Sequence, residues 1–158
     1  MRLATMTDYA LRLLMHVAQR PGRLCTIAEV AQAHGISEAH LMKVTHLLGR
    51  KRWIQTVRGK GGGMRLALPA SEINLGAVVR SMEPDFDLVE CFASGGQCTL
   101  SGRCRLTGVL AGAMRGFLAH LDGHCLADLL PGEGPPLPAE VHAPVSFRRM
   151  PDAGPLAG

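Results

Sequence analysis

The sequence predicts a mostly α-helical protein with a winged helix-turn-helix, a small β-hairpin wing and a long C-terminal dimerisation helix. Three observations lead to this prediction. Two helix-like segments are separated by a short glycine turn, a basic glycine-rich tip joins two β-prone runs, and a late segment carries a long apolar stripe. A length of 158 residues fits one domain with an appendage, and an apolar content of 47% is enough for a core.

The first helix is expected from Asp8 to Gln19. Its apolar residues repeat at the period of one helix face. They are Ala10, Leu11, Leu14, Val17 and Ala18. Thr7 or Asp8 is expected to cap the start of this helix, and Pro21-Gly22 to end it.

A helix-turn-helix is predicted between residues 26 and 50. The run Thr26–Glu29 is a capping-box pattern that indicates a second helix to about His34. Gly35 suits the left-handed residue that follows a helix, and Ser37 is then expected to cap a third helix that ends near Arg50. Two helices joined by a short glycine turn are typical of DNA-binding domains.

The third helix has an apolar face and a polar face. Leu41, Val44 and Leu48 share the side expected to face the core. The predicted DNA-contacting residues of this helix lie on the other side or at its start. They are Ser37, His40, Lys43, His46 and Arg50. In a basic segment this pattern favours a recognition helix over an ordinary solvated face, with Ser37 and His40 nearest the base edges.

The wing is predicted from two short strands, Trp53–Val57 and Met64–Leu68, around the tip at 58–63. The residues expected to contact DNA are Arg58, Gly59, Lys60 and Arg65. Glycine lets the backbone approach a ligand closely, while arginine and lysine supply charge for phosphates. The tip lacks the spacing of a nucleotide-binding P-loop, and a strand rather than a helix follows it, so that alternative is set aside.

The distribution of charge supports a polyanionic partner for the N-terminal part. Residues 1–65 hold eleven Lys/Arg against three Asp/Glu, which gives +8, whereas residues 66–158 hold six against ten, which gives −4. A basic unit joined to a mildly acidic remainder is typical of a nucleic-acid-binding domain with a second part of different function.

After the wing, Asn74 is expected to cap a short helix at Leu75–Met82. A long helix follows Cys104, marked by an apolar stripe. The stripe consists of Leu106, Leu110, Ala113/Met114, Phe117 and Leu121. Sixteen residues correspond to about 24 Å of helix. Such a helix needs a partner, either its own N-terminal unit or a second copy, and two-fold symmetry suits a protein that binds two DNA half-sites.

Cys91, Cys98 and Cys104 fall within fourteen residues, separated by glycine, serine and threonine. Three convergent thiolates suit a soft metal, so an iron–sulfur cluster and zinc are the main candidates. The spacing does not match zinc fingers, and a disulfide or three buried thiols are weaker alternatives. Cys25 and Cys125 are interpreted as structural thiols, and His120 and His124 as surface residues.

Several classes of protein are excluded by what the sequence lacks. No secretory signal or apolar run of membrane-spanning length is present, so a cytoplasmic protein with reduced thiols is expected. No arrangement with catalytic spacing indicates an enzyme. From residue 131 onward the chain is rich in proline and glycine and has no period, which predicts a disordered tail at 131–158.

Four parts of the first 130 residues together resemble a known family. They are Met6–Arg12, Val57–Gly63 with Arg65-Leu66, the three cysteines of the loop, and Leu126–Leu130. This combination resembles the NsrR-type repressors, iron–sulfur regulators that sense nitric oxide, and more broadly the winged-helix family that they share with IscR-type regulators. The implied organisation is a DNA-binding domain at 1–82, a cluster-binding loop at 83–104 and a dimerisation region at 105–130.

The resemblance implies a homodimer in which Cys91, Cys98 and Cys104 bind the cluster and Asp8 of the other subunit is the fourth ligand. A 4Fe-4S cluster is favoured, with 2Fe-2S as the alternative. IscR-type regulators instead have a histidine three residues after the last cysteine, and here that residue is Thr107. The implied function is a transcriptional repressor that binds double-stranded operator DNA. Nitrosylation of its cluster would release it from the operator.

Three other functions stay open as alternatives. The first is a regulator of the same fold that senses iron–sulfur supply or redox state. The second is a zinc-stabilised adaptor. The third is an electron-transfer ferredoxin, which needs four strong ligands and has no use for a basic wing.

Overall fold

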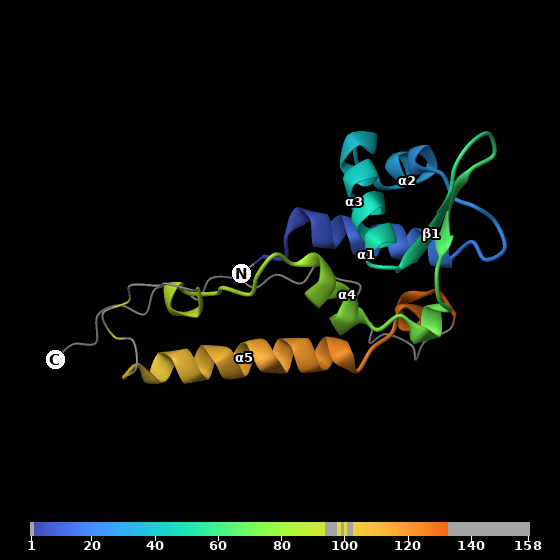
Figure 1. Ribbon diagram of the computed structural model, residues 1–158. Helices are drawn as coiled ribbons and strands as arrows, with labels where there is room; N and C mark the ends of the chain where they lie inside the picture. Colours follow the sequence, from blue (N-terminus) through green and yellow to red (C-terminus); the bar gives the residue numbers. More distant parts are fainter. Residues whose placement is uncertain (1, 94–97, 99, 101–102, 133–158) are drawn as a thin grey trace, which may run out of the picture.

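The computed structural model describes residues 2–93, 98, 100 and 103–132. Its helices are α1 (Thr5–Ala18), α2 (Ile27–His34), α3 (Glu38–Arg50), α4 (Leu75–Met82) and α5 (Arg105–Asp122). Its strands are β1 (Ile54–Val57) and β2 (Gly63–Leu66), and short 3₁₀ turns are η1 (Ala70–Glu72), η2 (Glu90–Phe92) and η3 (Leu126–Leu129). The mostly helical winged fold is therefore confirmed (Figure 1). The predicted disordered tail lies outside the described residues, apart from Pro131 and Gly132.

The start of α1 differs from the sequence-based prediction. The helix begins at Thr5, and Ala4 occupies its N-cap position without a side-chain cap. Thr7 and Asp8 lie inside the first turn, so the prediction that one of them caps the helix was wrong. The Ala4 N–H donates to Glu83 Oε1 at 2.9 Å. The N-cap residue of α1 is therefore held by a residue far along the chain, and local sequence does not reveal this contact.

The helix-turn-helix follows the predicted caps. The Thr26 hydroxyl accepts from the Glu29 N–H at 3.2 Å, and Glu29 Oε2 accepts from the Thr26 N–H at 2.7 Å. The bond from the Thr26 N–H, and then the Arg23 guanidinium, lower the pKa of Glu29 to about 2. Gly35 has φ +63°, and the Ser37 hydroxyl accepts from the His40 N–H at the start of α3. Local hydrogen bonds thus fix both ends of the turn.

The wing is an antiparallel hairpin in which Ile54 pairs with Leu66 and Val57 with Gly63. Its strands are shorter than predicted, but they lie where the sequence placed them. A Cβ atom on Gly63 would lie 2.7 Å from the Cys25 carbonyl oxygen, because Cys25 and Met64 exchange backbone hydrogen bonds. The end of β2 next to the tip is thereby attached to the segment between α1 and α2.

The core lies among α1, α3, the wing and α4. The predicted apolar face of α3 is buried through Leu41, Val44 and Leu48. Other buried apolar residues include Ala10, Leu13, Leu14, Val17, Val30, Met64, Val78 and Leu126. In the stripe predicted for α1, Leu11 and Ala18 are only half-buried. Cys25 is a fully buried free thiol, in agreement with its interpretation as a structural residue.

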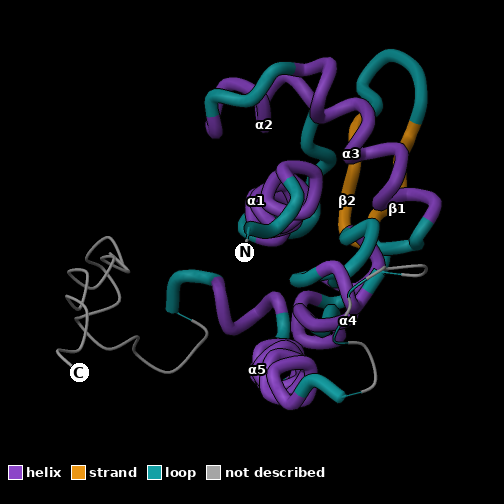
Figure 2. The backbone as a smooth tube through the Cα atoms, turned by 90° about the vertical axis from the view of Figure 1, so that its left-hand side faces the viewer, coloured by secondary structure: helices purple, strands orange, loops and turns teal. Residues whose placement is uncertain are grey.

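Figure 2 shows α1 and α5 nearly end-on, with α4 between them. The predicted Asn74 cap of α4 is confirmed by a bond from the Ala77 N–H at 2.9 Å. At the C-terminal end of α5, the Arg80 guanidinium binds both carboxylate oxygens of Asp122, at 2.5 and 2.6 Å. Polar contacts therefore attach the C-terminal end of α5 to α4. In the described part of the chain, no helix is long and apolar enough to cross a membrane.

Candidate nucleic-acid interface and cysteine site

The outward face of α3 carries the residues predicted to contact DNA, and the structure exposes all of them. They are Ser37, His40, Lys43, His46 and Arg50. Within the described residues, Lys43 and Arg50 form no ion pair, so their charges are available to a polyanion.

His40 is held more firmly than its neighbours on α3. Its Nδ1 lies 2.9 Å from the Ser37 hydroxyl, and its ring centroid lies 6.0 Å from that of Tyr9 on α1. Two contacts restrict the ring while leaving the residue exposed, which suits a side chain that must meet a base edge in one orientation. The sequence did not reveal the Tyr9 contact, because nothing local places α1 beside α3.

The tip of the wing presents its cations to solvent. Gly59 has φ +95° and Gly61 φ +77°, and the Gly62 N–H donates to the Gly59 carbonyl at 2.9 Å. This tight turn leaves Arg58 and Lys60 exposed, and neither forms an ion pair with another described residue. A side chain at Gly59 or Gly61 would be strained, so the tip depends on glycine.

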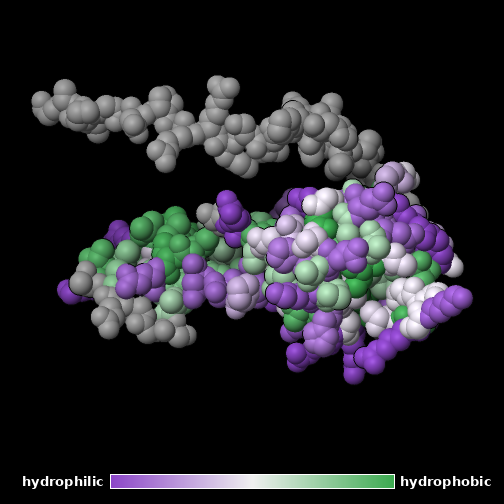
Figure 3. Space-filling view, turned by 90° about the horizontal axis from the view of Figure 1, so that it is seen from above, coloured by the Kyte–Doolittle hydropathy of each residue, from purple (hydrophilic) through white to green (hydrophobic). Residues whose placement is uncertain are grey.

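Arg65 lies on β2 rather than at the tip, and its Nε donates to Gln55 Oε1 across the hairpin at 3.1 Å. The tip of the wing and the first turn of α3 point to the same side of the molecule, away from α5 (Figure 1). Seen from that side, hydrophilic residues cover much of the winged-helix end, and hydrophobic residues gather at the opposite end (Figure 3). The predicted DNA-binding residues at the tip of the wing and at the start of α3 therefore share one side of the protein.

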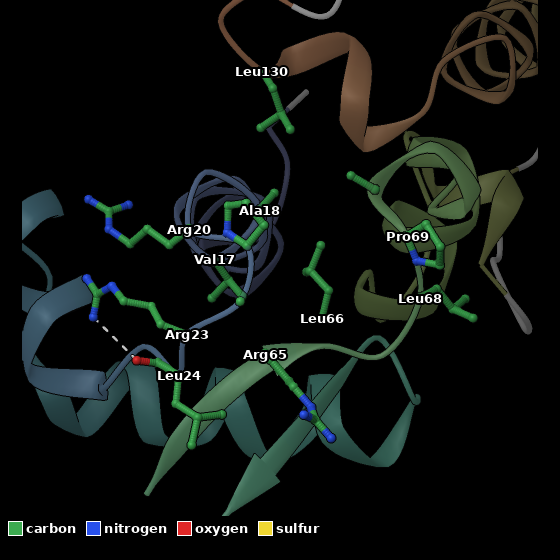
Figure 4. Close-up of a pocket in the computed structure, with 13 residues that line it drawn as sticks. Val17, Ala18, Arg20, Arg23, Leu24, Arg65, Leu66, Leu68, Pro69 and Leu130 are labelled. Atoms are coloured by element: carbon green, nitrogen blue, oxygen red, sulfur yellow. Dashed lines mark hydrogen bonds between the residues drawn. The ribbon is translucent and has the colours of Figure 1, made fainter. Parts of the chain in front are cut away.

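A cleft of about 490 Å³ lies between the end of α1 and β2 (Figure 4). Arg20, Arg23 and Arg65 line it, but each already has a partner. Arg20 donates to the His16 carbonyl at 2.9 Å, and Arg23 binds Glu29 at 2.8 Å. Each guanidinium of the cleft is therefore held by a hydrogen bond within the protein, although only Arg23 is paired with a carboxylate, and we do not treat the cleft as the functional site.

Two of the three loop cysteines lie next to Thr107, in the first turn of α5. Cys91 Sγ lies 3.5 Å from the Thr107 hydroxyl, and Cys104 is the N-cap residue of α5. The pKa of Cys104 is lowered by the Thr107 N–H first, then by the Thr107 hydroxyl and the Leu106 N–H. Donors at a helix N-terminus stabilise a thiolate, which is the form that binds metal. Thr107 therefore lies against both cysteines.

Cys98 is half-buried, and most of its neighbours in the loop lie outside the described residues. Among the described residues, no three His, Cys, Asp or Glu side chains are close enough to hold a metal ion. The convergence of three thiolates thus stays a prediction. The donors that are described fit a soft metal, because Cys91 and Cys104 adjoin one residue and Cys104 favours the thiolate.

Asp8 is half-buried on α1, with its side chain 44% exposed, and it pairs with Arg12 at 3.0 Å. A single chain does not test whether this carboxylate reaches a cluster in another subunit, so that role also stays a prediction. His120 and His124 are exposed, as the sequence-based interpretation expected. Cys125 is only half-buried, beside Asn74 at the end of α5.

The family model described as Rrf2, an iron-dependent transcriptional regulator, matches residues 3–132. The chain is 46% identical over 132 residues to the HTH-type transcriptional regulator NsrR of Bacillus subtilis (strain 168), which covers 82% of this chain and 90% of that protein. The NsrR of Halalkalibacterium halodurans is 44% identical over 135 residues, covering 84% and 92% of the two chains.

Solved structures share the fold. A putative transcriptional regulator from Listeria innocua has a TM-score of 0.73 at 24% identity, covering 94% of this chain and 97% of that one. T. potens IscR has a TM-score of 0.68 at 21% identity, covering 93% and 95%. These structures show the fold alone, whereas the family match and the two NsrR relatives confirm a transcriptional regulator rather than an enzyme. The chain belongs to the Rrf2 family of transcriptional regulators.

Proposed function

We propose that this protein is a cytoplasmic homodimeric repressor that binds double-stranded operator DNA and senses nitric oxide through an iron–sulfur cluster. A 4Fe-4S cluster is favoured over 2Fe-2S. The ligands would be Cys91, Cys98 and Cys104, with Asp8 supplied by the other subunit. Relatives named NsrR support this function. The observation that carries it is the meeting of Cys91 and Cys104 at Thr107, where the helix N-terminus favours a thiolate.

The DNA contacts would come from α3 and the wing. In this arrangement the exposed face of α3 enters the major groove, while Arg58 and Lys60 lie against phosphates of the backbone. Arg65 would add charge along the hairpin. These cations lie in the segment of net charge +8, so a duplex attracts this side of the protein before any base is read.

The second copy would pack against α5. None of the residues of this helix is buried, and the side chains of Leu106 and Val109 are 58% and 67% exposed. An apolar helix face of this length is costly to leave in water, and a two-fold dimer covers the same face on both copies. A dimer also places two α3 helices on two half-sites, about one helical turn of DNA apart.

An iron–sulfur cluster supplies iron atoms that react with nitric oxide. The chain itself connects the cysteine loop to the DNA-binding side through the C-terminal end of α4. There Ser81 accepts a hydrogen bond from Trp53 Nε1 at 2.9 Å, and Glu83 accepts from the Ala4 N–H at 2.9 Å. A change in the loop after Glu83 would therefore reach α3, β1 and α1. A tenfold to thousandfold loss of operator affinity needs only about 1.4–4 kcal/mol of difference between the two states.

The first experiment purifies the protein anaerobically and measures visible absorbance and binding to a duplex selected from a random pool. We expect a coloured protein that binds the duplex and releases it when nitric oxide is added. Cys98→Ala should be colourless, while Cys25→Ala should keep its colour because Cys25 lies in the core of the DNA-binding unit. Full colour in Cys98→Ala, or a duplex that stays bound after saturating nitric oxide, would contradict the proposal.

The second experiment tests the position of Asp8 with mixed dimers of Asp8→Ala and Cys98→Ala subunits. If Asp8 acts on the other subunit's cluster, one site keeps all four ligands, and about half of the wild-type cluster should survive. If Asp8 acts within its own subunit, neither site is complete. Cluster content near zero in verified mixed dimers would reject the cross-subunit ligand.

A further inference from the structure

Met42 is an apolar residue on the polar face of α3. Its side chain is 57% exposed, which makes it the most exposed large apolar side chain in residues 2–82. It does not belong to the apolar residues that pack around the core, unlike Leu41 and Leu47 beside it on the same helix. Its neighbours on the outer face are Lys43 and His46, and both are exposed. The sequence analysis passed over Met42 because it looked for polar residues on this face.

The surroundings of Met42 argue against a protein partner. A docking surface for a protein is a contiguous apolar patch, whereas Met42 stands among polar and cationic residues. The other large exposed apolar residues of this unit lie elsewhere, Val57 on the wing and Leu68 beyond β2. A single exposed apolar side chain is common on protein surfaces, so the position of Met42 on the helix matters more than its exposure.

The major groove offers a matching partner for a lone apolar side chain. Among the base edges displayed there, the C5 methyl group of thymine is the apolar one, and every other group donates or accepts a hydrogen bond. Methionine is suited to this contact because its unbranched, polarisable side chain adapts to a small apolar target. Polar neighbours on both sides can meanwhile contact phosphates or base edges.

We propose that Met42 reads the methyl group of a thymine in each operator half-site. This inference rests on the proposed DNA binding and adds a specificity-determining residue to it. The contact selects thymine over cytosine and over uracil at one position of each half-site. Since 5-methylcytosine carries a methyl group at the same ring position, it should partly replace thymine there.

The experiment uses anaerobically purified full-length protein and a duplex selected from a random pool. Thymines are replaced by deoxyuridine in symmetrical pairs, one pair at a time, which removes only the C5 methyl groups. Fluorescence anisotropy then gives the dissociation constant of each duplex for the wild type, Met42→Ala, Met42→Leu and Lys43→Ala. Circular dichroism checks that each variant is folded.

We expect one symmetrical replacement to weaken wild-type binding about ninefold to twenty-fivefold, since each half-site loses one buried methyl contact worth about threefold to fivefold. Met42→Ala should bind the thymine and deoxyuridine duplexes with nearly equal affinity, and Met42→Leu should keep most of the difference. Lys43→Ala is the matched control. It should bind both duplexes more weakly while keeping the wild-type ratio.

Three results would overturn the inference while leaving DNA binding intact. They are a selected duplex without a symmetrical thymine, a wild type that is indifferent to every replacement, and a Met42→Ala variant that keeps the full thymine preference. A wild type that binds no duplex at all would instead reject the proposed function, and this inference with it.

Discussion

The winged-helix unit and α5 differ in how completely they bury their apolar residues. Within the described residues, every buried apolar side chain except Leu126 lies between residues 10 and 82. The long helix α5 spans 18 residues and buries none of them, although it has its own apolar stripe. The first region closes its own core, whereas the second leaves its apolar stripe without a buried residue.

At the C-terminal end of α5 the two regions are attached by polar groups, by Leu121, which packs against the core, and by η3. Asn74 Nδ2 donates to the Asp122 carbonyl at 2.7 Å, and Arg80 pairs with the Asp122 carboxylate. The N-terminal end of α5, which starts after Cys104, has no buried residue to hold it. We therefore expect that substitutions can change the stability of the first region and the proposed response of the second region to nitric oxide separately.

The largest effect should come from removing a core side chain of the first region. Leu41 is fully buried, so Leu41→Ala should lower the free energy of unfolding by about 2–5 kcal/mol. Leu106→Ala on α5 should cost less than about 1 kcal/mol in dilute protein and more at high concentration, because only a dimer buries it. Urea unfolding followed by the fluorescence of the single tryptophan, Trp53, measures both. Equal and concentration-independent losses would remove the distinction between the regions.

The second effect concerns the cations of the two regions. Arg58→Ala and Lys60→Ala should each lower the slope of log affinity against log salt by about one unit, since each removes one phosphate contact. Arg115 is an exposed cation on α5, and Arg115→Ala should leave the slope unchanged. The measurement is duplex binding over a series of salt concentrations. An unchanged slope in the Arg58→Ala/Lys60→Ala double variant would show that the wing does not touch phosphates.

The sequence predicted the first region better than the second for a physical reason. Local hydrogen bonds define the ends of α2 and the start of α3. The residue types at these ends therefore predict them from sequence, as at Thr26, Glu29, Gly35 and Ser37. The predicted start of α1 was wrong because the N-cap residue Ala4 is bonded to Glu83, which lies 79 positions along the chain. Contacts of this kind bring residues together only after folding, and no local pattern encodes them.

The same reasoning applies to the candidate site. Sequence spacing identified Cys91 and Cys104, but their common neighbour Thr107 became visible only when η2 was placed beside α5. His16 was also missed, because a histidine on a helix gives no sign of burial until its neighbouring helix is known. It is 5% exposed, and its ring lies 5.4 Å from that of His34 on α2.

The third effect is a pH dependence within the first region. The pKa of His16 is lowered from its usual 6.5, mainly by burial and then by the charges of Arg20 and His34; Arg23 lowers it too and Glu29 opposes them. The unfolded chain therefore binds a proton at a higher pH than the folded protein does. Stability from neutral His16 is present above pH 6.5 and is lost as the pH falls below that value.

The midpoint temperature of thermal unfolding should thus decrease as the pH is lowered from about 7.5 to about 5.5. The decrease should be smaller in His16→Leu. The variant also removes Nε2 of His16, a buried atom without a hydrogen-bond partner among the described residues. His46→Leu on the exposed face of α3 is the control and should keep the wild-type dependence. A His16→Leu variant with the same fall as the wild type would show that burial of this ring does not couple to pH.

The smallest effect tests the attachment between the regions. What decides the test is whether the substitution raises or lowers the free energy of unfolding. Replacing a helical glycine by alanine stabilises a helix by up to about 1 kcal/mol where there is room. Gly49 in α3 has no atom within 4 Å of an added Cβ, so Gly49→Ala should stabilise the protein. At Gly76 in α4 the added Cβ would overlap the Asp122 carboxylate and lie 2.8 Å from Arg80 Nη1. Gly76→Ala should therefore lose this gain, because the Arg80–Asp122 pair must move.

A double-mutant cycle separates the overlap from any other effect of the alanine. In an Asp122→Ala background the obstacle at Gly76 is gone, so Gly76→Ala should recover the stabilisation that Gly49→Ala shows in the wild type. Urea unfolding of the four proteins of the cycle gives the coupling directly. If Gly76→Ala is equally stabilising with and without Asp122, then α5 is not held against α4 through this pair. The two regions would in that case be joined by Asn74, Leu121 and η3, and α5 would be freer to reorient when Cys104, its N-cap residue, loses the proposed metal.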